Sequence, residues 1–124
     1  MNESKMGQVQ LKIMQMLWEL KRATARELTE ELSKSEPIAH STVQTLLRQL
    51  ENKGSVNHEL DGRTFYFFPV VQEEKVKKSA TRELLQNVFK GSVGGLVSHL
   101  LENEKVSTEE IAEIRRLLDK KRKK

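Results

Sequence analysis

Residues Ser41–Gly54, with the sequence STVQTLLRQLENKG, combine an apolar stripe and a polar face at helical spacing. The apolar residues recur at i, i+3, i+4 and i+7, which places them on one side of a helix: Val43, Leu46, Leu47 and Leu50. The other side carries short or planar hydrogen-bonding side chains, namely Ser41, Gln44, Thr45, Arg48 and Asn52. Such a helix suits the major groove of DNA. An ordinary amphipathic surface helix has the same pattern, so the flanking segments decide between the two interpretations.

Both ends of this predicted helix carry recognisable signals. Ser41 and Gln44 fit the S-x-x-Q capping box, which predicts that the helix begins at Ser41. Gly54 follows the last apolar residues of the stripe, as is common at helix C-termini. The stretch is therefore predicted to be one complete helix.

A first helix is predicted near the N-terminus. From Val9 to Leu20 the apolar residues recur at helical spacing, and Met14 and Trp18 widen the stripe. A stripe this wide must be covered, so we assign Met14 and Trp18 to the core rather than to a binding pocket. The connector Lys21–Ala23 that follows can pair as a brief strand.

A second helix is predicted between these two. Thr24 and Glu27 form a capping box that opens it, and it ends near Ser33. The following loop, Lys34–His40, contains Pro37, which excludes helix there. The second and third helices thus form a helix-turn-helix candidate, with a connector longer than the tightest turns.

After the third helix the apolar period changes from 3.6 to 2, which is typical of a β-hairpin. Val56–Leu60 alternates apolar and polar residues, Asp61-Gly62 predicts a tight turn, and Thr64–Phe68 is rich in aromatic residues. Phe65 and Phe67 are expected to face the core. A two-stranded hairpin is not stable alone, so it must lie against the helices.

Three helices followed by a hairpin form the winged-helix arrangement, in which the hairpin tip is a wing and Arg63 can reach a phosphate. The predicted fold is mainly α with a small β-hairpin. It consists of a winged helix-turn-helix domain over residues 1–71 and a helical dimerisation region with a basic tail over residues 72–124.

The C-terminal region is predicted to hold three short amphipathic helices, with breaks near Gly91 and Asn103–Lys105 and a capping box from Ser107 to Glu110. About 50 residues lie near the lower size limit for independent folding, so a second copy of the chain would cover the apolar faces better. Packing against its own winged helix is the alternative. The residues predicted to form the dimer interface are Leu84, Leu85, Val88, Val93, Leu96, Val97, Leu100, Ile111, Ile114 and Leu118.

The chain has 124 residues and a formal net charge of +4. The positive charge is unevenly spread: residues 1–70 hold 9 Lys and Arg against 9 Asp and Glu, whereas residues 71–124 hold 13 against 9. Five of those 13 form the closing run Lys120–Lys124, which we expect to be a solvated, frayed tail. Bulk charge therefore supports DNA binding only weakly.

Catalytic and membrane functions are not indicated. Without cysteine there is no disulfide, thiolate metal site or cysteine nucleophile, and His40, His58 and His99 are scattered singly without metal-ligand spacing. The sequence contains neither an apolar run long enough for a membrane span nor a signal-peptide pattern. We therefore expect a cytoplasmic protein that is not an enzyme, uses no cofactor and does not insert into a membrane.

With these elements placed, the chain resembles the BlaI/MecI/CopY family of bacterial repressors, the penicillinase-repressor type. The resemblance rests on QLKIMQMLW at residues 10–18, TAREL at 24–28, STVQTLLRQLENKG at 41–54 and RTFYFFP at 63–69. It implies a homodimeric winged-helix repressor that binds a palindromic operator in double-stranded DNA. It places DNA contacts at Ser41, Thr42, Thr45, Arg48 and the wing residue Arg63.

The side-chain chemistry agrees with most of these positions. Arg48 and Gln44 can read the base edges of guanine and adenine, respectively. Thr42 lies toward the flank of the helix, where it is expected to contact phosphate. Lys53 and Arg63 would mainly set the register on the DNA backbone.

Two departures from the family bear on regulation. Copper-responsive members carry a C-terminal cysteine cluster, so the lack of cysteine excludes copper sensing through thiolates. Members controlled by a membrane-bound sensor are cut at an Asn-Phe bond, and Ser92-Val93 occupies that place here. A regulatory membrane-bound protease is therefore a partner only if it accepts another bond.

Two other functions fit a winged helix. One is a protein-interaction adaptor, which acidic residues on the exposed face of residues 41–54 would have favoured. The other is a nonspecific architectural DNA binder that uses the basic tail. Binding to operator and random duplexes at increasing salt separates the three functions.

Overall fold

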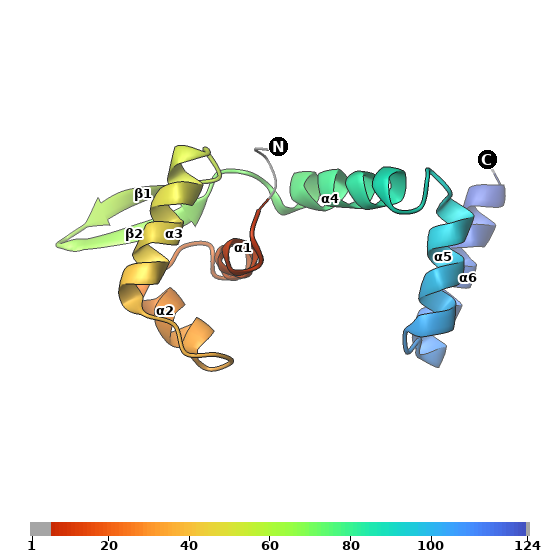
Figure 1. Cartoon of the computed structure of the whole chain (residues 1–124), viewed down its shortest axis with the longest axis horizontal. Coiled ribbons are helices and arrows are strands. Elements are labelled where there is room, and N and C mark those ends of the chain that lie inside the picture. Colours follow the sequence, from red (N-terminus) through yellow and green to blue (C-terminus); the bar gives the residue numbers. More distant parts are fainter. Residues whose placement is uncertain (1–5, 124) are drawn as a thin grey trace. The chain divides into compact units, whose positions relative to one another are not determined.

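The computed structural model describes residues 6–123 (Figure 1). The elements follow in the order α1 (Gln8–Leu20), α2 (Ala25–Ser33), α3 (His40–Asn52), β1 (Val56–Asp61), β2 (Thr64–Pro69), α4 (Glu73–Asn87), α5 (Val93–Asn103) and α6 (Thr108–Arg122). The chain divides into two compact units that meet within α4, between Lys78 and Ser79. A predominantly helical chain with one hairpin confirms the predicted fold class.

The core of the first unit lies between α1, α2, α3 and the start of β1. Its fully buried large side chains are Ile13, Met14, Leu17, Leu28, Val43, Leu47, Leu50 and Val56. Burial of each such side chain contributes roughly 1.5–3 kcal/mol, so this set is the main source of stability in the unit. Trp18 packs against the same core, which confirms the assignment of the Met and Trp residues of α1 to packing.

The start of α2 is capped as its sequence predicts. The Oγ1 atom of Thr24 accepts a hydrogen bond from the backbone N–H of Glu27 (3.0 Å), and Oε1 of Glu27 accepts one from the backbone N–H of Thr24 (2.8 Å). Two backbone donors that have no partner within the helix are thereby satisfied.

Replacing Thr24 with alanine should lower the free energy of unfolding of the first unit by about 1 kcal/mol, because the Glu27 N–H loses its side-chain acceptor. Urea unfolding followed by circular dichroism measures this loss. Thr24→Ser is the matched control, since it keeps the hydroxyl. Equal destabilisation by both substitutions would show that the lost methyl group, rather than the cap, matters.

Helix α3 begins one residue earlier than predicted. Its N-cap is Ala39, and no side chain caps the helix. The backbone N–H groups of Thr42 and Val43 donate to the Ala39 carbonyl at 3.0 and 3.2 Å. The predicted capping box from Ser41 to Gln44 is therefore wrong, because Ser41 already lies inside the first helical turn.

The far end of α3 agrees with its sequence signal. Gly54 adopts φ +81°, a left-handed conformation that glycine enters without the steric cost of a Cβ atom. The chain then turns directly into β1, so the end of α3 and the start of the hairpin are held in one place.

Strands β1 and β2 pair in antiparallel register, with His58 opposite Phe67 and Leu60 opposite Phe65. Ala23 adds a short bridge on the other side of β2 through two backbone hydrogen bonds with Phe67 (3.0 and 2.8 Å). Both the predicted hairpin and the brief strand in the connector are thus confirmed.

The expected burial of the two hairpin phenylalanines is only half correct. Phe67 packs against the core, whereas Phe65 is 52% exposed. The two side chains share a face, but Phe65 lies two residues nearer the hairpin tip, beyond the buried part of the sheet. There it contacts the ring of His58 edge to face, with the centroids 5.2 Å apart.

The chain leaves the first unit next to Trp18. The indole N–H of Trp18 donates to the carbonyl oxygen of Val71 at 3.0 Å. The backbone N–H groups of Val70 and Val71 donate to the carbonyl of the buried Ser55 at 2.8 and 3.2 Å. These bonds tie the segment before α4 to the winged-helix core.

The second unit holds the end of α4 together with α5 and α6. Lys90 and Gly91 both have positive φ and make the turn after α4. Ser107 and Glu110 form the predicted capping box at the start of α6. The closing basic run is part of α6 through Arg122, so the expectation of a frayed tail is wrong for Lys120–Arg122. Among the described residues, no helix combines the length and apolarity that a membrane crossing requires.

Candidate nucleic-acid interface

The polar side of α3 is open to solvent along the helix. The exposed side chains on it are those predicted from the sequence: Ser41, Thr42, Gln44, Thr45 and Arg48. Ser41, Thr45 and Arg48 follow one another at i, i+4 and i+7, so they lie along one line parallel to the helix axis. The opposite side is anchored by the fully buried Val43, Leu47 and Leu50. A rigid helix thus presents a row of polar groups.

The hydrogen-bonding capacity of this row is largely unused. In the described part of the chain, the guanidinium groups of Arg48 and Arg63 make neither an ion pair nor a hydrogen bond. The hydroxyl of Thr45 donates to the Ser41 carbonyl at 3.0 Å, which leaves its oxygen free to accept. Arg48 therefore has its five donors available for a ligand.

Two contacts hold α3 to the rest of the first unit at its flanks. Nε2 of Gln10 on α1 donates to Oε1 of Gln49 at 2.9 Å. Oγ1 of Thr29 on α2 lies 3.3 Å from Nδ1 of His40, the first residue of α3. His40 therefore contacts the preceding helix, where the turn of the helix-turn-helix leads into α3.

The end of α3 is also linked to the hairpin. Oε1 of Glu51 lies 2.5 Å from Nδ1 of His58 on β1. The ring of His58 packs against Phe65 and Phe67 of β2, with centroid distances of 5.2 and 5.5 Å. This contact fixes the wing relative to α3. This contact could not be predicted from the sequence, in which His58 stands out only as an isolated histidine.

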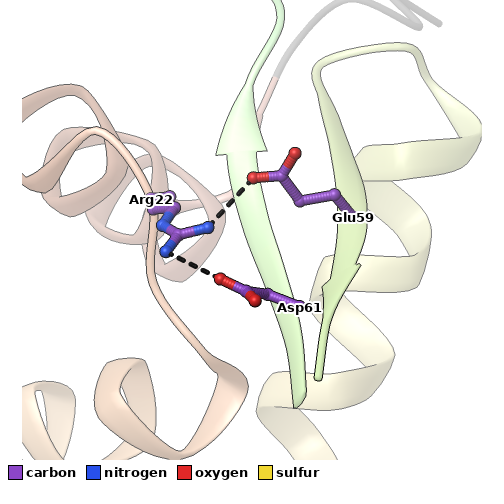
Figure 2. Close-up of polar contacts among 3 residues, drawn as sticks. All are labelled: Arg22, Glu59 and Asp61. Carbon is purple, nitrogen blue, oxygen red and sulfur yellow. Dashed lines mark hydrogen bonds and ion pairs between the residues drawn. The ribbon is translucent and has the colours of Figure 1, made fainter. Parts of the chain in front are cut away.

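The wing has a second anchor, on the face of the hairpin that carries Glu59 and Asp61. Arg22, in the connector before α2, donates from Nη1 to Glu59 (3.1 Å) and from Nη2 to Asp61 (3.2 Å), as Figure 2 shows. Its guanidinium carbon lies 4.0 Å from the ring centroid of Tyr66. The hydrogen bond to Asp61, followed by that to Glu59, raises the pKa of Arg22 above its ordinary value, so this group stays charged.

The role of Arg22 could not be predicted from the sequence, because its partners lie 37 and 39 residues away. One signal was present. Glu59 and Asp61 are two apart on a predicted strand, and two carboxylates on one strand face favour a nearby cation. No local sequence pattern identifies which residue provides this positive charge.

The other predicted basic contacts lie at the two ends of this surface. Lys53 is the C-cap residue of α3 and is exposed. Arg63 follows Gly62 in the hairpin turn and is also exposed. We call the surface formed by the polar row of α3, Lys53 and Arg63 the α3–wing surface.

The second unit presents a different kind of surface. No residue of α4, α5 or α6 is buried. Leu85, Leu96 and Ile114 of the predicted interface are half-buried. The other seven predicted interface residues are exposed, up to 63% for Val88: Leu84, Val88, Val93, Val97, Leu100, Ile111 and Leu118. Apolar exposure on this scale is uncommon in monomeric soluble proteins.

The fold and the α3–wing surface define the class: a helix-turn-helix with an open polar recognition face and an adjoining wing is a winged-helix DNA-binding protein. Comparison with known proteins makes this specific. A family model described as "Penicillinase repressor" matches residues 6–120. The chain belongs to the penicillinase repressor family and is a DNA-binding transcriptional repressor.

Individual relatives agree with the family assignment. The chain is 30% identical over 109 residues to the methicillin resistance regulatory protein MecI of Staphylococcus aureus strain N315, which covers 88% of this chain and 89% of the relative. It is 31% identical over 110 residues to the penicillinase repressor of Bacillus licheniformis, covering 89% of this chain and 86% of the relative. Among solved structures, monomeric Bacillus licheniformis BlaI in complex with the blaP half-operator is similar, with a TM-score of 0.51 and 30% identity over 59% of this chain and 89% of that one.

Proposed function

We propose that the protein represses transcription as a homodimer that binds a palindromic operator through α3 of each copy. The observation that carries this proposal is the α3–wing surface, in which a rigid helix presents exposed polar groups beside a wing. A relative of 30% identity binds a half-operator as a monomer, which supports one half-site for each winged helix. A DNA target also favours a cytoplasmic location for the protein.

Within this surface the side chains divide by chemistry. Arg48 and Gln44 can form bidentate contacts with guanine and adenine edges, and Thr45 can contact either a base or a phosphate. Ser41 and Thr42, at the first turn of α3, suit phosphate contacts, because helix N-termini present backbone N–H groups to anions. We place Lys53 and Arg63 on the DNA backbone, where they set the register of the protein.

Dimerisation is proposed to occur through the exposed apolar side chains of α4, α5 and α6. A C2 interface pairs the same patch on both copies, so one apolar face per chain is sufficient. Two recognition helices related by such symmetry reach successive major grooves, about 10 base pairs apart or a multiple of it.

Selection of bound sequences from a random DNA pool tests this function most directly. A recovered palindrome with half-sites about 10 base pairs apart, or a multiple of it, is the expected result. Equal affinity for selected and random duplexes over a salt titration would instead identify an architectural binder. Lack of binding to either duplex at low salt would leave the protein-interaction adaptor.

Deleting the basic run of residues 120–124 should change affinity for the selected duplex by less than about twofold, because specific contacts are assigned to the α3–wing surface. Gel-shift titration of the full-length and shortened proteins measures the difference. An architectural binder would instead lose affinity with the tail, and its salt dependence would become shallower.

We also propose that a membrane-bound regulatory protease is a partner of this protein and cleaves it at a bond other than Asn-Phe. Ser92-Val93 lies at the start of α5, where Oγ of Ser92 accepts a hydrogen bond from the N–H of Gly95 at 2.9 Å and Val93 is exposed. Cleavage there would separate α5 and α6 from the winged helix and so remove most of the proposed interface. Mass spectrometry of the protein after exposure to such a protease identifies the bond that is cut.

A further inference from the structure

The wing carries two carboxylates, Glu59 and Asp61, close in sequence to Arg63, the cation in the hairpin turn. Glu59 and Asp61 are both exposed on β1, and Asp61 lies two residues before Arg63. A wing that approaches DNA brings these groups toward a backbone with one negative charge per about 1.7 Å of helix axis. Unpaired, they would oppose the contact that Arg63 is proposed to make.

Arg22 lies outside the hairpin in sequence and forms an ion pair with both carboxylates. Its two terminal nitrogens each bond one of them (Figure 2). The guanidinium also stacks on the ring of Tyr66. The next residue, Ala23, is bonded to Phe67 of β2 through its backbone, so Arg22 is attached to the sheet itself. With Arg22 in place, the charges of the two carboxylates, Arg22 and Arg63 cancel.

These ion pairs contribute little to the stability of the fold. The side chains of Arg22, Glu59 and Asp61 retain 43%, 54% and 61% of their accessible surface, and exposed pairs of this kind add little to the free energy of unfolding. Their effect on the local charge is larger by comparison, because a phosphate within a Debye length of about 10 Å at 0.1 M salt experiences each uncompensated carboxylate.

We propose that Arg22 is a positioning residue for DNA binding, which acts by cancelling the charge of Glu59 and Asp61 so that the wing tip can lie against phosphates. The proposal rests on the proposed function. It assigns Arg22 an effect through the two carboxylates rather than a contact of its own with DNA.

Four proteins test it: the wild type, Arg22→Gln, the double variant Glu59→Gln/Asp61→Asn, and the triple variant that combines all three changes. The probe is a duplex that carries the selected sequence, titrated by gel shift at several salt concentrations. Arg22→Gln should weaken binding about five- to tenfold at 0.1 M salt, and the loss should shrink as salt rises. The double variant should bind at least as tightly as the wild type, and so should the triple variant, in which Arg63 is the one charge left among these four groups.

The triple variant is the informative comparison, because a fold defect caused by the loss of Arg22 would not be repaired by removing carboxylates. A triple variant as weak as Arg22→Gln would therefore overturn the proposal, as would wild-type affinity for Arg22→Gln itself. The double variant keeps the test independent of how well Arg22→Gln folds, since a loss of affinity there also contradicts charge cancellation. If the wild type binds no duplex even at low salt, the proposed function fails instead.

Discussion

Replacing Leu100 with glutamate is expected to convert the protein to a monomer and to lower its apparent affinity for a palindromic operator by about 100-fold or more. Leu100 is an exposed apolar residue of α5 in the proposed interface. An interface that closes over it would bury an unpaired carboxylate, which is strongly unfavourable. Operator binding would then lose the gain of two linked half-sites, which reaches 10²- to 10⁴-fold when geometry permits both to bind.

Sedimentation at micromolar concentration measures the first effect, and titration of a full and a half operator measures the second. Ser98→Glu is the matched control, because it adds the same charge to the exposed polar side of the same helix. A Leu100→Glu protein that stays dimeric would remove α5 from the interface. A wild-type monomer with tight operator binding would contradict the dimer altogether.

Replacing Arg48 with alanine should relax base preference at one position of each half-site. The reason is that the free guanidinium on the exposed face of α3 is proposed to form bidentate hydrogen bonds with a guanine edge. One bidentate pair is worth about 1–3 kcal/mol of discrimination, which corresponds to about 5- to 150-fold between bases. A panel of duplexes with single substitutions in the half-site measures it.

Arg63→Ala is the contrasting variant, since it removes one cation from the wing and leaves α3 untouched. Its affinity should fall by a similar factor on every duplex of the panel, and the slope of affinity against salt should decrease by about one counterion. Identical profiles for Arg48→Ala and Arg63→Ala across the panel would remove the base-reading role from Arg48.

The elements of the first unit could be predicted because their signals are local. The capping box of Thr24 and Glu27, the apolar spacing of α3 and the turn at Gly62 each involve residues within one or two turns of chain. The box at Ser41 misled because a serine inside a first helical turn has the same spacing to glutamine as a serine that caps it. Only the conformation of Ala39 distinguishes the two cases.

The wing shows what local patterns cannot specify. Alternation identified the face that Phe65 shares with Phe67, but how far the helices reach along the hairpin depends on tertiary packing, and Phe65 lies beyond it. The contacts of Arg22 with Glu59 and Asp61, and of Glu51 with His58, join segments whose proximity results from the fold itself. The polar row of α3 was predictable residue by residue, whereas the contacts that orient the wing beside it were not.

Trp18, whose indole is held by the Val71 carbonyl, is the only tryptophan in the sequence. Its fluorescence therefore monitors the winged helix and the exit of the chain from it, while the second unit is silent at that wavelength. When the Val71 bond opens, the indole becomes hydrated and its emission shifts to the red. The protein thus carries an intrinsic optical reporter that follows its DNA-binding half separately from the half assigned to self-association.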